Sequence, residues 1–254
     1  MTKAGDYWRE QQKAWAIPEE IIAQAPESPW IHPAVVFQIP EVIVPSPSHD
    51  CANEVNPQSL LDIGCGGGVA AYGSSAPHVI GLDHQQEMLD MFKVNADKYQ
   101  RSCETILGNW PEASEKTPKA DVVVAHHVAF NVQNIEEFIL TMSQHANKRC
   151  ILEVPKFHPQ TNVKGLWKHF WNIDRPSTPT ADDLMPILAE LGIKAHIKHW
   201  VGETRGLSNF DEDVKIVRIR LCLPQSREEE VKQYLLKHPP SKVRELATIW
   251  WDIQ

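Results

Sequence analysis

The sequence predicts an α/β protein with a doubly wound, mostly parallel sheet, and three observations support this prediction. Short apolar runs alternate with helical patterns between residues 59 and 155. Runs of this kind suit strands that are buried on both faces of a parallel sheet. The first run leads into a glycine-rich turn, Asp62–Gly68, and the second ends in Asp83. Such a sheet places its ligand site at the carboxyl ends of the strands.

The alternation itself consists of strands and intervening helices of ordinary length. The strands are predicted at 59–63, 78–83, 103–107, 121–125 and 149–154. The helices are predicted at 69–75, 85–98 and 135–146. Strands that alternate with helices in this way indicate a parallel sheet with helices on both faces.

Beyond residue 155 the pattern changes, and helical additions interrupt it. The expected elements are an aromatic helix at 164–171, a helix at 181–191, a strand at 193–201, two helices within 211–237 and a last strand at 246–251. Thr180 is a suitable cap for the second of these helices, and Gly192 ends it. Pro224 separates the two later helices.

The first 58 residues are predicted to form a helical and irregular extension that acts as a lid. Residues 5–25 carry apolar positions at helical spacing, with a restart at Pro18, since proline is tolerated in the first turn of a helix. The proline-rich stretch 26–59 is predicted to be irregular, apart from a short helix near 34–39. The remaining residues, 59–254, are predicted to form one ligand-binding domain with insertions at about 156–178 and 208–240.

Composition favours a cytoplasmic protein that acts on a small molecule. The formal net charge of -8 argues against nucleic acid as a partner, because proteins that bind it usually show a basic stripe. No apolar run approaches the length that crosses a bilayer, and the N-terminus has no apolar signal core. The five cysteines share no CxxC spacing, which indicates reduced thiols and no metal centre. The oligomeric state is left open.

The most specific motif is the turn Asp62-Ile63-Gly64-Cys65-Gly66-Gly67-Gly68. Gly64 and Gly66 lack a Cβ where the chain turns and where a ligand must approach the backbone. A dinucleotide fingerprint would need a third glycine at Val69, so a nicotinamide oxidoreductase is disfavoured. The run fits acidic-x-Gly-x-Gly-x-Gly instead, and a carboxylate at Asp62 suits a cationic amino group better than a pyrophosphate. The alternative is a purely structural glycine turn.

Two further signals follow the second and third strands. Asp83 ends its strand, where a carboxylate accepts the hydroxyls of a ribose; the alternative is an aspartate that caps the next helix. Asn109 follows the third strand and suits the edge of an adenine. Its neighbour Trp110 would wall the base, or else belong to the core.

These motifs give residues 59–155 a resemblance to the class I S-adenosylmethionine-dependent methyltransferases of the small-molecule type. The motifs that carry it are Asp62–Gly68, Gly81-Leu82-Asp83, Gly108-Asn109-Trp110 and Asp121–His127. The flanks also resemble bacterial methyltransferase-domain proteins, through Tyr7-Trp8, Pro29-Trp30, Arg175-Pro176 and Trp250-Trp251. The resemblance implies a Rossmann-like sheet of seven strands, whose last strand is antiparallel and inserted between the fifth and the sixth.

The same resemblance implies S-adenosyl-L-methionine as cofactor and a set of residues that bind it. For the methionine half these are Asp62, Gly64, Cys65, Gly66 and Gly68. For the ribose and adenine they are Asp83, His84, Met88, Asn109 and Trp110, with His126 lining the cofactor side. The family often has an acidic residue where Asn109 stands, so this sequence departs from the pattern there.

His126 and His127 follow the fourth strand, where the family brings the acceptor to the methyl group. The chain lacks the Asp/Asn-Pro-Pro-aromatic motif of enzymes that methylate exocyclic base nitrogens. A base is needed only if the acceptor loses a proton, and histidine is suited to that task. Because side chains alternate along a strand, we expect only one of the pair, His127, to face the acceptor as the base. In the alternative, neither is a base, and one packs against the sheet.

The sequence therefore predicts methyl transfer from S-adenosylmethionine to a small-molecule acceptor. The aromatic side chains of 157–171 and of the N-terminal helix would roof the acceptor pocket, unless they belong to the core. An RNA or protein methyltransferase is the alternative within the class. A non-catalytic, methyltransferase-like binding or regulatory protein is the alternative outside it.

Overall fold

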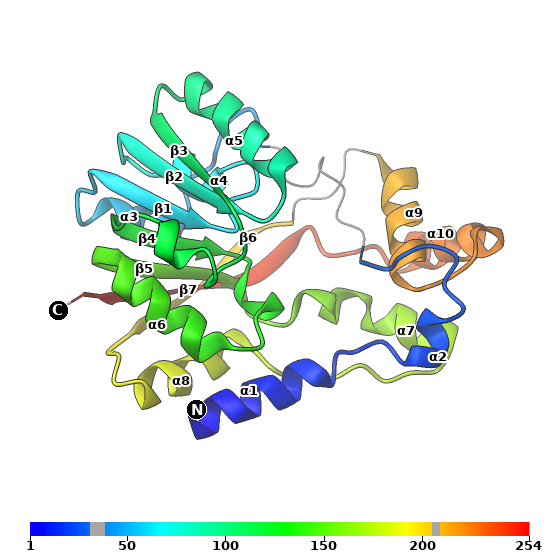
Figure 1. The fold of residues 1–254 in the computed structure, drawn as a ribbon. Coiled ribbons are helices and arrows are strands. Elements are labelled where there is room, and N and C mark those ends of the chain that lie inside the picture. Colours follow the sequence, from blue (N-terminus) through cyan, green and yellow to red (C-terminus); the bar gives the residue numbers. More distant parts are fainter. Residues whose placement is uncertain (31–38, 205–208, 254) are drawn as a thin grey trace.

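The computed structural model describes residues 1–30, 39–204 and 209–253. Within these residues a seven-stranded sheet runs through the centre of the molecule, with helices on both faces (Figure 1). Its strand order is β3-β2-β1-β4-β5-β7-β6. The strands are β1 (Ser59–Ile63), β2 (His78–Asp83), β3 (Ser102–Leu107), β4 (Ala120–His126), β5 (Ala146–Pro155), β6 (His196–Glu203) and β7 (Val243–Asp252).

The register confirms the predicted topology. The first five strands pair in parallel, whereas β7 lies antiparallel between β5 and β6. The predicted bounds of β1 and β2 are correct; β3 begins one residue earlier than predicted, and β4 is one residue longer at each end. β5 begins earlier than expected, at Ala146, and β6 is shifted to begin at His196. β7 is longer than predicted because it pairs with β6 along its length, which a local pattern does not reveal.

One face of the sheet is covered by α1 (Lys3–Lys13), α6 (Ile135–His145) and α8 (Leu184–Glu190), and the other by α3 (Pro47–Asn53), α4 (Val69–Tyr72) and α5 (Gln86–Lys98). The N-terminal helix α1 is held on the first face by Glu136 of α6, which pairs with Arg9 and accepts from the backbone N–H of Thr2. The indole of Trp8 is fully buried there and donates to the carbonyl of Val132 at 2.9 Å.

Two predicted local structures need correction. Residues 47–53 form α3 rather than irregular chain, because Ser46 and His49 make a capping box and Pro47 occupies the first turn. The helix after the glycine turn is a single turn that ends at Tyr72 rather than extending to residue 75. The short helix expected near 34–39 lies mostly outside the described residues.

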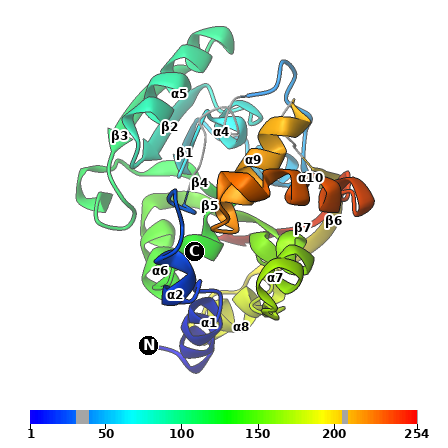
Figure 2. The same ribbon diagram turned by 90° about the vertical axis from the view of Figure 1, so that its right-hand side faces the viewer.

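Four further helices form a group with its own apolar core. They are α2 (Glu19–Ile22), α7 (Lys164–Trp171), α9 (Phe210–Arg220) and α10 (Glu228–Lys237). Figures 1 and 2 show this group at one end of the sheet. The helix α7 follows β5 and α9 follows β6, so the group stands at the carboxyl ends of these strands. Leu166, Trp167 and Leu221 are among the side chains at its centre.

None of the helices built from the described residues is both long and apolar enough to cross a membrane.

Candidate active site

The glycine turn joins β1 to α4 and needs glycine for two reasons. Gly64, Gly66 and Gly68 have φ of 68°, 49° and 95°, a region that side chains with a Cβ rarely adopt. Space is also missing, because a Cβ at Gly64 would lie 2.7 Å from Cγ2 of Val128. At Gly68 a Cβ would lie 2.4 Å from the ring of Tyr72. The backbone of the turn is therefore packed closely at the carboxyl end of β1.

Asp83 lies beside this turn and is 6% exposed. One carboxylate oxygen accepts from the N–H of Gly66 at 3.1 Å, and the other accepts from the N–H of Gln85 at 3.0 Å. Gln85 is the residue that precedes α5, so Asp83 supports the start of that helix as well as the turn. An ionised carboxylate has about four acceptor positions, so two contacts leave capacity for ligand hydroxyls.

Asp62 is the next-to-last residue of β1, lies behind the turn and is 1% exposed. Its carboxylate accepts one hydrogen bond from the described residues, from the N–H of Ala71 at 3.3 Å. Burial raises the pKa of Asp62 to about 7, and the negative charge of Asp83 adds to the rise, while the bond from Ala71 opposes it. A cation placed against this carboxyl group would stabilise the ionised form and so lower the raised pKa.

The remaining predicted cofactor residues do not all face the same space. His84 is exposed, with Nδ1 at 3.3 Å from Asp83, and Asn109 is exposed after β3. Met88 is 2% exposed on α5. Cys65 is buried in the core under α4 and α5, and burial raises the pKa of its thiol.

Trp110 points toward α6, on the opposite face of the sheet from α5. Its Nε1 donates to the carbonyl of Phe138 at 3.4 Å, and its ring meets His145 edge-on with a centroid distance of 5.0 Å. These contacts favour the interpretation of Trp110 as a core residue. A role in binding adenine stays a prediction.

The side chains of His126, at the end of β4, and His127, just after it, both approach one carboxylate. The alternation of side chains along a strand predicts that they point to opposite sides. β4 ends at His126, and His127 has a φ of 62°, so the alternation of an extended strand stops between them. Nδ1 of His126 lies 3.7 Å from Oε1 of Glu153, and Nε2 of His127 lies 3.3 Å from the same atom. The left-handed backbone of His127 turns its ring back toward β5.

Glu153 is the functional candidate that reasoning from the sequence missed. It occupies the register position opposite His126 on β5 and is 6% exposed. Burial raises the pKa of Glu153, but the charges of His126 and His127 and a hydrogen bond from His127 outweigh that effect, so its pKa lies far below the ordinary range. The signal that could have found it is a lone glutamate within the apolar half of a strand, close to its carboxyl end.

The polar layer around Glu153 continues into α3. Ser46 donates its hydroxyl to Oε2 of Glu153 at 3.0 Å, and the ring of His49 lies 5.8 Å from that of His126. The layer is not arranged as a metal centre, since no group of three or more His, Cys, Asp or Glu within the described ranges is placed to hold an ion. It is a buried hydrogen-bonded cluster at the carboxyl ends of β4 and β5.

The aromatic side chains predicted to roof the site are divided between two cores. Trp15 stacks on His158 with ring centroids 4.0 Å apart, and His158 meets Phe130 edge-on at 5.4 Å. Burial lowers the pKa of His158 to about 4, with a contribution from the positive charge of Arg175. Trp167 instead lies in the core of the four-helix group.

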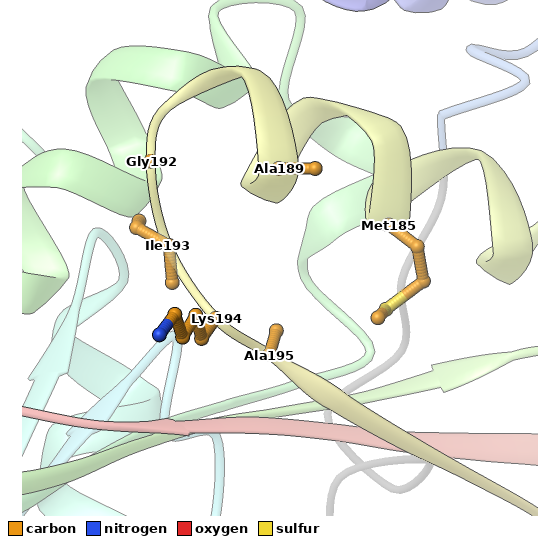
Figure 3. Close-up of a pocket in the computed structure, with 6 residues that line it drawn as sticks. All are labelled: Met185, Ala189, Gly192, Ile193, Lys194 and Ala195. Atoms are coloured by element: carbon orange, nitrogen blue, oxygen red, sulfur yellow. The ribbon is translucent and has the colours of Figure 1, made fainter.

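A surface cavity elsewhere in the protein is formed by α8 and the segment that leads to β6. Figure 3 shows its lining by Met185, Ala189, Gly192, Ile193, Lys194 and Ala195. It contains none of the predicted site residues, and its only ionisable side chain is Lys194. This cavity is therefore not the candidate active site.

Part of the chain is similar to known proteins. Residues 60–148 match the methyltransferase-domain family. The ubiquinone biosynthesis O-methyltransferase of Rickettsia typhi (strain ATCC VR-144 / Wilmington) is 30% identical over 95 residues, which are 37% of this chain and 38% of that protein. The chain thus matches less than half of the length of this curated relative.

Two solved structures share the fold. The YcgJ protein of Bacillus subtilis has a TM-score of 0.53 at 15% identity, covering 77% of this chain and 92% of its own. The plantazolicin methyltransferase BamL has a TM-score of 0.50 at 13% identity, covering 99% of this chain and 100% of its own. Residues 60–148 of this chain thus form a domain that matches the methyltransferase-domain family, within a fold shared with solved methyltransferase structures.

Proposed function

We propose that this protein transfers the methyl group of S-adenosylmethionine to a small-molecule acceptor at the carboxyl ends of β1 and β4. The observation that carries the proposal is the turn of three left-handed glycines with Asp62 behind it and Asp83 beside it. Asp62 disfavours a pyrophosphate, because its buried carboxylate would repel the phosphate charges. The arrangement suits a ligand with a cationic half and a ribose.

The described residues fit this cofactor by charge and by hydrogen-bonding capacity. Asp62 is buried with a single hydrogen bond from the described residues, so a nearby ammonium group would compensate its charge. Asp83 retains acceptor positions for two ribose hydroxyls beyond its bonds to Gly66 and Gln85. We propose that Gly64, Gly66 and Gly68 let the methionine half approach the backbone, with His84, Met88 and Asn109 on the side of the ribose and adenine.

When bound, the cofactor supplies a methyl group attached to a positively charged sulfur. The sulfur is a good leaving group because it departs as a neutral thioether. What the protein must add is placement of the acceptor in line with the methyl carbon, which is the main source of acceleration in such displacements. We propose that His127 also takes the proton of an acceptor hydroxyl. His126, the last residue of β4, would line the cofactor side.

A hydroxyl acceptor is supported by two points. The Rickettsia relative is named an O-methyltransferase, and an oxygen acceptor must lose a proton, for which His127 is the proposed base. The net charge of -8 and the absence of any pairing among the five cysteines favour a small-molecule acceptor in the cytoplasm. An acceptor on RNA or protein is the other outcome that the experiment below can give.

The proposal is tested in two steps. Calorimetry with S-adenosylmethionine, S-adenosylhomocysteine and NAD should show binding of the two sulfur ligands and none of NAD. Binding of NAD alone would refute the cofactor assignment. A turnover screen with labelled S-adenosylmethionine over fractionated cell extract, read by product mass, should then yield a methylated small molecule. Binding without a labelled product in any fraction would favour a non-catalytic binding protein.

A further inference from the structure

Glu153 is a buried carboxylate on β5, and its charge contributes nothing to the pairing of the strands. It stands among apolar neighbours on β5, where an isolated carboxylate would cost several kcal/mol unless partners compensate it. Its Oε2 accepts from the hydroxyl of Ser46, and its Oε1 faces the rings of His126 and His127. This carboxylate can therefore influence where the protons sit on the two histidine rings.

The ring of His127 lies between a side chain that can only accept a hydrogen bond and one that can only donate. Its Nε2 is 3.3 Å from Oε1 of Glu153 and 3.2 Å from Nη2 of Arg244. An ionised carboxylate can only accept a hydrogen bond, and a guanidinium can only donate one. Glu153 therefore favours a proton on Nε2, whereas Arg244 favours a lone pair there. A neutral imidazole carries one ring proton, so one of the two determines the tautomer.

The other ring nitrogen decides between them. Nδ1 of His127 is buried and has no hydrogen-bond partner among the residues that the structure describes. If Arg244 prevailed, the proton would sit on Nδ1 and would be a buried donor without an acceptor, which is rare in folded proteins. If Glu153 prevails, Nδ1 carries only a lone pair, and an unused acceptor is the lesser penalty. The unpaired Nδ1 is then a position that a ligand hydroxyl can satisfy.

We propose that Glu153 is a positioning residue for His127, which holds the ring proton on Nε2 and leaves the lone pair of Nδ1 for the proton of a hydroxyl acceptor. This inference rests on the proposed function. In the step, the acceptor oxygen forms a bond to the methyl carbon, and the carbon–sulfur bond breaks with its electron pair remaining on sulfur. The acceptor's proton passes to Nδ1, and the carboxylate of Glu153 stabilises the imidazolium that results.

The tautomer can be measured without an acceptor. Long-range proton–nitrogen spectra of the full-length, ¹⁵N-labelled protein distinguish a protonated ring nitrogen from an unprotonated one. At about pH 8, where histidine is generally neutral, His127 should show a proton on Nε2, with its signals assigned by their loss in His127→Gln. In Glu153→Gln the proton should move to Nδ1, because Arg244 can only donate to Nε2. In Arg244→Gln it should stay on Nε2.

A matched control is Glu136→Gln, which removes another buried, ion-paired glutamate, on α6 at the opposite face of the sheet from α3. It should leave the spectrum of His127 unchanged. A wild-type ring with its proton on Nδ1, or the same tautomer in Glu153→Gln as in the wild type, would overturn the inference. If Glu153→Gln fails to fold, the wild-type and Arg244→Gln spectra decide, since Nδ1–H in either contradicts it. Failure to bind S-adenosylmethionine would refute the proposed function separately, whatever tautomer is seen.

Discussion

Binding of S-adenosylmethionine should release a proton from Asp62 near neutral pH. In the folded protein without ligand, burial raises the pKa of this carboxyl from its ordinary 3.8 to about 7. The folded state therefore binds a proton more readily than the unfolded state, so Asp62 makes the protein less stable as pH rises from about 4 to about 7. A cationic ligand group beside the carboxylate favours the ionised form, so binding should drive the proton off.

The magnitude follows from the size of the rise in pKa. From 3.8 to about 7, at about 1.4 kcal/mol for each tenfold step, the ionised carboxylate costs the free protein about 4 kcal/mol above pH 7. If the bound cation restores an ordinary pKa, affinity should fall about tenfold for each pH unit below 7 and level off above it. The affinity at about pH 6 should thus be roughly a tenth of that at about pH 8. About half a proton should leave on binding at pH 7.

Calorimetry in two buffers of different ionisation enthalpy measures this proton directly. Asp62→Asn is the matched control, because it keeps the shape of the side chain and cannot ionise. Any proton exchange that persists in it belongs to the ligand's own amino group. Thermal melts add a second readout, since the wild type should lose stability relative to Asp62→Asn between pH 6 and 8. Equal proton release in both proteins, or a wild-type affinity that is flat across this range, would refute the reasoning.

Three further outcomes are expected from single substitutions. Asp83→Ala should weaken S-adenosylmethionine binding by about 1.5–3 kcal/mol, and it should also lower the melting temperature because Gly66 loses its buried acceptor; normal binding in a destabilised variant would restrict Asp83 to a structural role. His127→Ala should lower turnover of the eventual acceptor by roughly 10²–10⁴-fold with affinity for the cofactor little changed, whereas His126→Ala should mainly weaken cofactor binding; two variants with wild-type rates would exclude a base. Gly64→Ala should destabilise the fold by about 1–3 kcal/mol through its backbone conformation, and adding Val128→Ala should relieve only the steric part; chemical denaturation separates these terms.

Much of the sheet was predictable because its signals are local. β1 and β2 are short apolar runs bounded by turn residues, and their observed bounds equal the predicted ones. The glycine turn was likewise readable, since its requirement for a positive φ restricts the residue type at Gly64 and Gly68. Pairing between strands that are distant in the sequence leaves no such local signal. The placement of β7 between β5 and β6 came from the resemblance to a family, not from the pattern of β7 itself.

The core of the four-helix group was not predictable from periodicity. An apolar stripe shows that a helix packs against something, but it does not say against what. Here Ile21, Leu166 and Val231 come from segments separated by more than sixty residues and share one core. α3 was missed for another reason. Its capping box uses a histidine at the third position instead of the usual Glu or Gln, so the signature was disguised.

The site residue hardest to predict is His127, because its backbone contradicts the strand that precedes it. A non-glycine residue in the left-handed region costs on the order of 1 kcal/mol or more and persists only where the surroundings impose it. Glu153 is a large part of those surroundings, since its carbonyl accepts from the N–H of His127 at 2.7 Å while its carboxylate faces the ring. The carbonyl of Glu153 thus holds the backbone of His127, and its carboxylate holds the ring. A strand that simply continued would have pointed the ring away from that carboxylate, so the strained conformation is what creates the pair.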